Sequence, residues 1–152
     1  MTEPTPAPKK HISFEIPGPP FSLKRARIGR HGKFARMFDP KENVSWKGAA
    51  AVHMLAARQA KGLQPFAGPV NLTVVAYFPC PKSDERKRDP RPERWSMNQK
   101  DADNILKAVG DAGNGILWLD DRQVVNANVQ KRIAAQGQPP RTLVMAHEET
   151  ER

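Results

Sequence analysis

The sequence predicts one small domain of the α/β class, in which strands and helices share a single core. Three observations lead to this prediction. Several segments alternate apolar and polar residues as strands do, two stretches have helical character, and no repeat or linker divides the chain. A chain of 152 residues is long enough to bury a core of its own.

The N-terminal segment predicts a disordered leader followed by a strand. Residues 1–10 alternate proline with small and polar residues, a composition that does not pack. In residues 11–16, Ile12, Phe14 and Ile16 alternate with polar neighbours, which predicts a half-buried strand. The prolines of residues 17–20 end it.

Residues 21–41 form a basic segment in which Asp39 is the only acidic residue. Gly29, Gly32 and flanking prolines favour an extended arm or hairpin over a helix. With aromatic residues interleaved, such a strip can follow the phosphates of a nucleic acid; the alternative is a solvated loop anchored by its aromatic residues. The candidate phosphate-binding residues are Lys24, Arg25, Arg27 and Arg30.

Residues 41–61 predict a helix that ends before Gly62. An apolar stripe with helical spacing is expected to face a sheet, and its small residues suggest close packing. The stripe consists of Val44, Gly48, Ala51, Val52 and Leu55.

The next segment, residues 70–78, is rich in β-branched and aromatic residues and predicts a central strand. Residues 79–100 then carry four prolines and many basic residues, so we expect a long loop of functional importance. Its candidate DNA-binding residues are Arg86, Lys87 and Arg88.

The C-terminal third predicts a helix and two further strands. The helix covers 104–112 with Asp103 as its N-cap, and the strands cover 124–131 and 142–146. We therefore expect a folded domain over 11–147 and a short acidic tail over 148–152.

Charge and composition restrict the class of protein. Lys and Arg total 25 against 16 Asp and Glu, a net charge of +9, which favours a polyanionic partner. The single cysteine excludes an intrachain disulfide scaffold, and no apolar run is long enough to span a membrane. We expect a cytoplasmic protein with no membrane partner.

Five aspartates gather within residues 101–121 of this otherwise basic chain. Asp101 and Asp103 are expected to alternate along an extended stretch, and Lys107 follows Asp103 by one helical turn. Another turn leads to Asp111, and the pair Asp120–Asp121 can return to the same place. Carboxylates this close repel one another unless a cation offsets the repulsion, so we predict a Mg²⁺ site, with Mn²⁺ as an alternative ion.

A purely structural interpretation is also open at this point. Asp103 could cap a helix and pair with Lys107, while Asp120 and Asp121 could be turn residues.

The arrangement of these residues resembles the RusA family of Holliday junction resolvases. The resemblance lies in Asp101-x-Asp103-Asn104-x-x-Lys107-x-x-x-Asp111, followed eight residues later by Asp120-Asp121-x-Gln123-Val124. The opening Phe14-Glu-Ile-Pro17-Gly18-x-Pro20 with Lys24-Arg25 is also similar, and the likeness runs from about residue 11 to residue 146.

This resemblance implies a small α/β domain, a mixed sheet flanked by helices, that acts as a homodimer of bacterial or phage origin. It implies Mg²⁺-dependent cleavage of four-way DNA junctions by paired symmetric incisions. Asp101, Asp103 and Asp121 would be catalytic, together with Lys107. The metal ligands would be those three aspartates and Asp120, while Asn104 and Asp111 match further motif positions.

Two other functions compete with this one. A non-catalytic module could use the same basic surface to bind branched DNA. A metal-dependent enzyme acting on nucleotides is disfavoured because the chain has no glycine-rich phosphate loop of the GxxxxGK[ST] type.

Overall fold

The computed structural model describes residues 10–25, 27–31 and 34–149, so most of the predicted leader and the end of the predicted tail lie outside the described residues. The main sheet contains β1 (His11–Pro17), β4 (Val70–Phe78), β5 (Arg94–Trp95), β6 (Val124–Ile133) and β7 (Arg141–Glu148). The remaining elements are β2 (Arg27–His31), β3 (Phe34–Phe38), helices α1 (Lys41–Ala60) and α2 (Ala102–Ala112), and the 3-10 turns η1 (Lys82–Asp84) and η2 (Asp121–Gln123).

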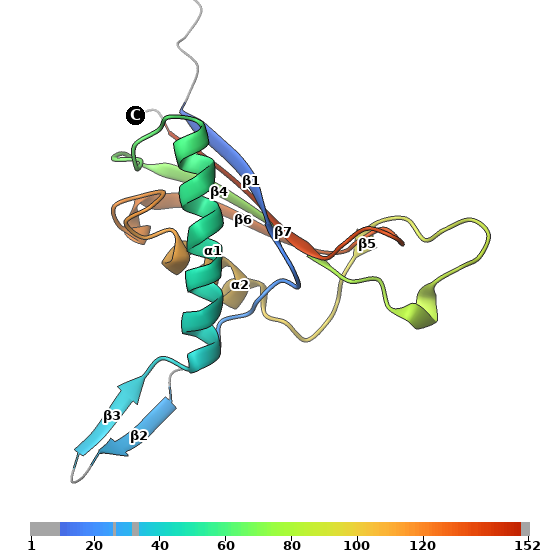
Figure 1. The fold of residues 1–152 in the computed structure, drawn as a ribbon, viewed down its shortest axis with the longest axis horizontal. Coiled ribbons are helices and arrows are strands. Elements are labelled where there is room, and N and C mark those ends of the chain that lie inside the picture. The colour runs from blue at the N-terminus through green and yellow to red at the C-terminus, as the bar shows by residue number, and fades with distance from the viewer. Residues whose placement is uncertain (1–9, 26, 32–33, 150–152) are drawn as a thin grey trace, which may run out of the picture.

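The main sheet is mixed and has the strand order β1-β7-β4-β6-β5 (Figure 1). β7 runs antiparallel to β1 and β4, β4 and β6 are parallel, and β5 pairs antiparallel with the end of β6. The connection between the parallel strands β4 and β6 contains α2, because parallel neighbours need a long crossover. The predicted α/β domain with a mixed sheet is confirmed.

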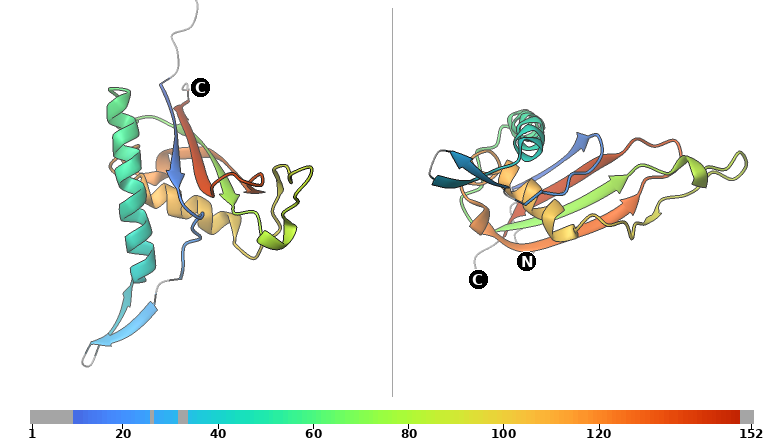
Figure 2. Two further views of the ribbon diagram at one scale, coloured as in Figure 1. Left: turned by 45° about the vertical axis from the view of Figure 1, so that its right-hand side comes forward. Right: turned by 90° about the horizontal axis from the view of Figure 1, so that it is seen from below.

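The core lies between the sheet and the two helices, which also pack on each other (Figure 2). In β1 the predicted alternation is present, with Ile12 and Ile16 buried and Ser13 exposed. Val74 and Val144 of neighbouring strands join Met54 of α1 and Val109 of α2 in the same core. Within the described residues both helices cover one face of the sheet, and the other face carries no helix.

Helix α1 forms as predicted, but the predicted apolar stripe is not its buried face. Val44 and Val52 are 56% and 67% exposed, whereas Asn43, Ala50 and Met54 are buried. The buried face of α1 is displaced from the predicted stripe by one residue, which corresponds to a rotation of about 100° around the helix axis. Burial follows the large side chains Met54 and Trp46, which remove more apolar surface from water than small residues do.

The basic segment forms the predicted hairpin from β2 and β3, which extends past the N-terminal end of α1 (Figure 1). At its base the Phe21 ring stacks on Trp46 of α1, with ring centroids 5.5 Å apart. This contact anchors the arm to the helix that begins directly after it.

Helix α2 begins earlier than predicted. Ala102 is its first residue and Asp101 is its N-cap, with the Asp101 Oδ1 accepting a hydrogen bond from the Asp103 N–H at 3.0 Å. The prediction of Asp103 as the N-cap was wrong, because the capping oxygen lies two residues before the N–H that it accepts. Asp103 therefore lies in the first helical turn and not in an extended stretch with Asp101.

The segment between β4 and α2 has little regular structure, as predicted, and projects from the sheet as a second arm (Figure 1). Its only regular elements among the described residues are η1 and β5. Neither described helix has the length and apolar character needed to cross a membrane.

Candidate active site

One face of α2 lines a pocket of about 690 Å³. Asp101, Asn104, Lys107 and Asp111 contribute to it, at successive turns of the helix. The opposite face of α2 enters the core through Ile105 and Val109, which fixes the polar face outward. The structure thus brings four of the predicted site residues to one surface.

The base of the hairpin forms the other wall of this pocket. Lys24 and Arg25, predicted from charge alone, line it together with Leu23. The Leu23 N–H donates to the Asn104 carbonyl at 3.2 Å, which joins this wall directly to α2. Cationic and acidic predicted residues, 76 to 87 positions apart in the chain, therefore share one pocket.

Asn43 of α1 holds the cationic wall in place. This fully buried side chain accepts the Lys24 N–H at 2.9 Å and donates to the Lys24 carbonyl and to Asp39 Oδ1, both at 2.8 Å. Sequence reasoning missed Asn43. The available signal was its spacing from Ala50 and Met54 on the true buried face.

A second missed pair lies in the same pocket. Lys47 Nζ is 2.8 Å from Asp39 Oδ2. Hydrogen bonds from Lys47 and Asn43 lower the pKa of Asp39 below its usual value, so this carboxylate stays ionised. The Asp39–Lys47 pair neutralises one acidic and one basic side chain of the pocket. Lys107, by contrast, has no acidic partner within 4.0 Å among the described residues.

Asp121 lies near the other end of α2. Its Cβ would be 4.0 Å from a Cβ at Gly110, and it lines a smaller pocket of about 230 Å³ with Lys107 and Gly110. Burial raises the pKa of Asp121, and the nearby carboxylates of Asp120 and Asp111 raise it further. Lys107 lines both pockets and so connects the two groups of carboxylates.

Asp120 has a structural task besides any chemistry. Its Oδ1 accepts the Arg122 N–H at 3.0 Å, and this hydrogen bond lowers the pKa of Asp120. Gln123 completes a capping box at the start of η2 by accepting the Asp120 N–H at 2.9 Å. Its amide also donates to the Phe66 carbonyl at 2.7 Å, which ties η2 to the chain ahead of β4.

The five predicted aspartates do not converge on a single point within one chain. Asp103 and Asp111 are separated by eight helical residues, about 12 Å along the axis of α2. Asp101 and Asp103 lie at the N-terminal end, and Asp111, Asp120 and Asp121 lie at the other. Among the described residues no three acidic, histidine or cysteine side chains are grouped to hold a metal ion.

The donor chemistry of the site nevertheless suits Mg²⁺. This ion prefers carboxylate oxygens and keeps several of its waters, so one or two carboxylates from the protein suffice. Burial is the largest cause of the raised pKa of Asp121, and the further increase from the Asp120 and Asp111 carboxylates is the kind of repulsion that a divalent cation offsets.

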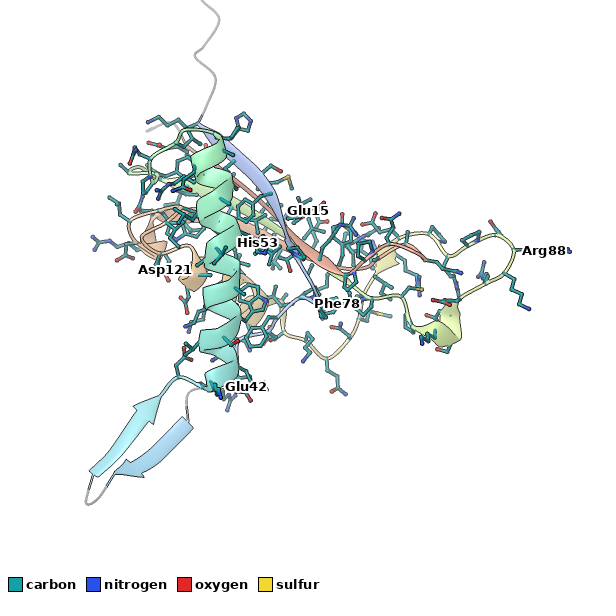
Figure 3. The ribbon with its side chains drawn as sticks, in the orientation of Figure 1. Glu15, Glu42, His53, Phe78, Arg88 and Asp121 are labelled. Atoms are coloured by element: carbon teal, nitrogen blue, oxygen red, sulfur yellow. The ribbon has the colours of Figure 1, made fainter. Side chains whose placement is uncertain are left out.

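The remaining candidate DNA-binding residues are spread over the molecule. The backbone places Arg27 and Arg30 on β2, while their side chains lie outside the described part of the structure. Arg86, Lys87 and Arg88 are exposed in the second arm, and Figure 3 shows Arg88 at its tip, on the side of the molecule away from Asp121.

Comparisons with known proteins cover nearly the whole described domain. The family model described as "Endodeoxyribonuclease RusA" matches residues 17–145, which includes both pockets. Over 143 residues the chain is 34% identical to "Uncharacterized protein YqaN" of Bacillus subtilis (strain 168), a match that covers 90% of this chain and 96% of that relative.

Proposed function

Because the chain belongs to the RusA family of endodeoxyribonucleases, we propose that it resolves four-way DNA junctions by Mg²⁺-dependent, paired symmetric incisions during recombination and repair. The observation that carries this proposal is the shared pocket, in which Lys24 and Arg25 face the carboxylates of α2. A DNA strand needs cations for its flanking phosphates and carboxylates for the metal at the scissile one. The bacterial relative and the DNA substrate support a cytoplasmic location.

The roles follow from the chemistry of each group. Within one chain Asp101 and Asp103 lie at one end of α2 and Asp120 and Asp121 at the other, so one or two of these carboxylates would hold a given Mg²⁺ ion, which would supply a Lewis acid and an activated water when bound. The Lys107 ammonium, which has no acidic partner in the described part, is suited to stabilise negative charge on the scissile phosphate. Lys24 and Arg25 would bind the neighbouring phosphates and orient the strand.

The decisive experiment is cleavage of a synthetic four-way junction across Mg²⁺ concentrations by the wild-type chain and by Asp103→Asn. We expect Mg²⁺-dependent nicking by the wild type, and a rate at least about a hundredfold lower for the variant, because the carboxylate charge is lost while the shape is kept. Junction binding by the variant, measured separately, should be retained.

A matched control is Asp89→Asn. Asp89 is exposed in the second arm and has a φ of 60°, a conformation that asparagine also accepts. This variant should cleave the bound junction at the same rate as the wild type. Wild-type cleavage by Asp103→Asn would remove Asp103 from the catalytic set.

The open edge of β6 supports the proposed homodimer. β5 pairs only with the last two residues of β6, so in the described part no strand covers this edge from Val124 to Gln130. That stretch carries no charged residue and no proline, the usual means of preventing edge pairing. An antiparallel contact with the same edge of a second copy would give a two-fold dimer.

Sedimentation equilibrium tests this contact. The wild-type chain should have twice the monomer mass, and Val125→Lys, which places a charge on the exposed edge, should shift the chain towards the monomer. A dimer that is unchanged by this substitution would place the interface elsewhere.

One observation favours the non-catalytic alternative, a module that binds branched DNA. Within one chain the described carboxylates form no group of three for a metal. Tight junction binding without any Mg²⁺-dependent turnover by the wild type would support that alternative.

A further inference from the structure

Trp95 and Met97 form an exposed apolar pair just ahead of the candidate active site. Trp95 is 64% exposed and Met97 is 97% exposed. Between them Ser96 is buried, so the segment alternates as an extended chain does and both large side chains point to the same side. We name these two residues the Trp95–Met97 pair.

The backbone that carries this pair is fixed by β6. The Ser96 N–H donates to the Lys131 carbonyl at 2.9 Å. Lys131 Nζ in turn donates to the carbonyls of Asn98 at 2.9 Å and Lys100 at 2.6 Å. A large apolar side chain held out in water by a rigid backbone loses little freedom on binding a ligand.

Arg132 of β6 positions the indole ring of Trp95. The two residues are directly paired across the strands, and the Arg132 guanidinium carbon lies 4.1 Å from the Trp95 ring centroid. Arg132 is itself held by Glu93, with 3.2 Å between Nε and Oε1. One face of the ring is therefore covered by a cation, and the exposure of the residue leaves the other face to solvent.

The charges around the pair favour a nucleic acid over a second copy of the chain as its partner. Five cations lie around the pair, against the two acids Glu93 and Asp84, of which Asp84 pairs with Arg94. The cations are Arg91, Arg94 and Lys100 in the same segment and Lys131 and Arg132 on β6. Two copies meeting here would bring like charges together, whereas a polyanion would be attracted.

We propose that the Trp95–Met97 pair binds an unstacked nucleobase at the branch point of the DNA. The open face of Trp95 stacks on this base, and the Met97 side chain inserts as a wedge against the neighbouring base. This inference rests on the proposed function. Where four duplex arms meet, base pairs lose a stacking neighbour, and aromatic platforms and apolar wedges bind such bases. Met97 precedes Asp101 by four residues, so the wedge lies within about 14 Å of the candidate site.

The test compares binding of a four-way junction and of a linear duplex in EDTA, so that metal-dependent cleavage cannot consume the DNA. Trp95→Ala and Met97→Ala should each weaken junction binding about tenfold and change duplex binding less than about twofold. Trp95→Phe should keep most of the junction affinity. Val52→Ala, an exposed apolar truncation on α1, is the matched control and should change neither affinity.

A direct readout is indole fluorescence. Of the three tryptophans, Trp118 is fully buried and Trp46 is partly buried and stacked on Phe21, and both remain in every variant. The quenching on junction binding that persists in Met97→Ala and is lost in Trp95→Phe is therefore the contribution of Trp95. Wild-type junction affinity in both alanine variants would overturn the inference. So would an equal loss of junction and duplex binding, or a changed oligomeric mass, which would make the pair a subunit contact.

Failure of the proposed function would be recognised separately. A wild-type chain that binds the junction no more tightly than the duplex has no branch-point selectivity, and this result contradicts the proposed function whatever the variants do.

Discussion

Asn43 shows how much of the site depends on a single buried amide. It joins the backbone of Lys24 to Asp39 through three hydrogen bonds and has no exposed surface. Buried polar groups that lose a partner keep the full cost of their desolvation. The placement of the cationic wall is therefore linked to the stability of the fold.

Replacing Asn43 with alanine should lower the free energy of unfolding by about 2 kcal/mol, because the Lys24 N–H and carbonyl lose their partner. Urea unfolding measures this change. Ser45→Ala, an exposed substitution in the same helix, is the control and should stay within about 0.5 kcal/mol of the wild type. A loss for Asn43→Ala no larger than that of the control would mean that water replaces these bonds at no cost.

Asp39 should make stability depend on pH in the acidic range. Its folded pKa lies below its usual value, so its contribution is present above pH 3.8 and is lost as the pH falls through the folded pKa. Asp39→Asn should therefore melt slightly below the wild type at pH 7, with the difference shrinking below pH 3.8. A difference that does not change with pH would show that the charge of Asp39 has no part in it.

At the scale of elements, two glycines at the C-terminal end of α2 differ in how closely neighbouring side chains approach them. A Cβ at Gly113 would lie 2.6 Å from Cζ2 of Trp118, a residue with no exposed surface. A Cβ at Gly110 would meet Asp121 only at 4.0 Å, an ordinary van der Waals distance. The first glycine is required by packing, whereas the second leaves room for a methyl group.

Two alanine substitutions in this region should therefore have opposite effects. Gly110→Ala should raise the free energy of unfolding by about 0.5–1 kcal/mol, because alanine is the better helix former. Gly113→Ala should lower it by about 1–3 kcal/mol through overpacking against Trp118. Denaturant unfolding of the two variants checks this, and equal stabilities would show that Trp118 can shift freely.

At the scale of the whole molecule, basic side chains lie at two separate places, Lys24 and Arg25 at the base of the hairpin and Arg86, Lys87 and Arg88 in the second arm, where Figure 3 labels Arg88. A branched DNA has several duplex arms, so one cationic surface can hold the strand at the candidate site while the other meets a neighbouring duplex. Arg88 at the tip of the second arm is suited to phosphate contact, which positions DNA without reading its sequence.

The salt dependence of junction binding should show whether the base of the hairpin and the second arm each contact DNA phosphates. Lys24→Ala and Arg25→Ala should each reduce the slope of log affinity against log salt by about 0.9, and replacing Arg86, Lys87 and Arg88 together should reduce it by about 2.7. Lys10→Ala is the control: Lys10 directly precedes β1, which begins at the end of the molecule away from the hairpin (Figure 1), so this variant should leave the slope unchanged. An unchanged slope in the triple variant would show that DNA does not reach the second arm.

The sequence by itself determined four of the five strands of the main sheet, the two helices, the basic hairpin and the acidic residues of α2, because these features depend on the spacing of neighbouring residues, whereas β5 lies in a segment predicted to be a loop. Only the tertiary structure decided which side of α1 is buried, since Met54 and Trp46 compete there with small residues that share the same periodicity. It also joined Lys24 and Arg25 to Asp101 and Lys107, and it divided the aspartates between two ends of one helix. Contacts between distant segments arise from the packing of whole elements, and the spacing of residues along the chain does not contain that information.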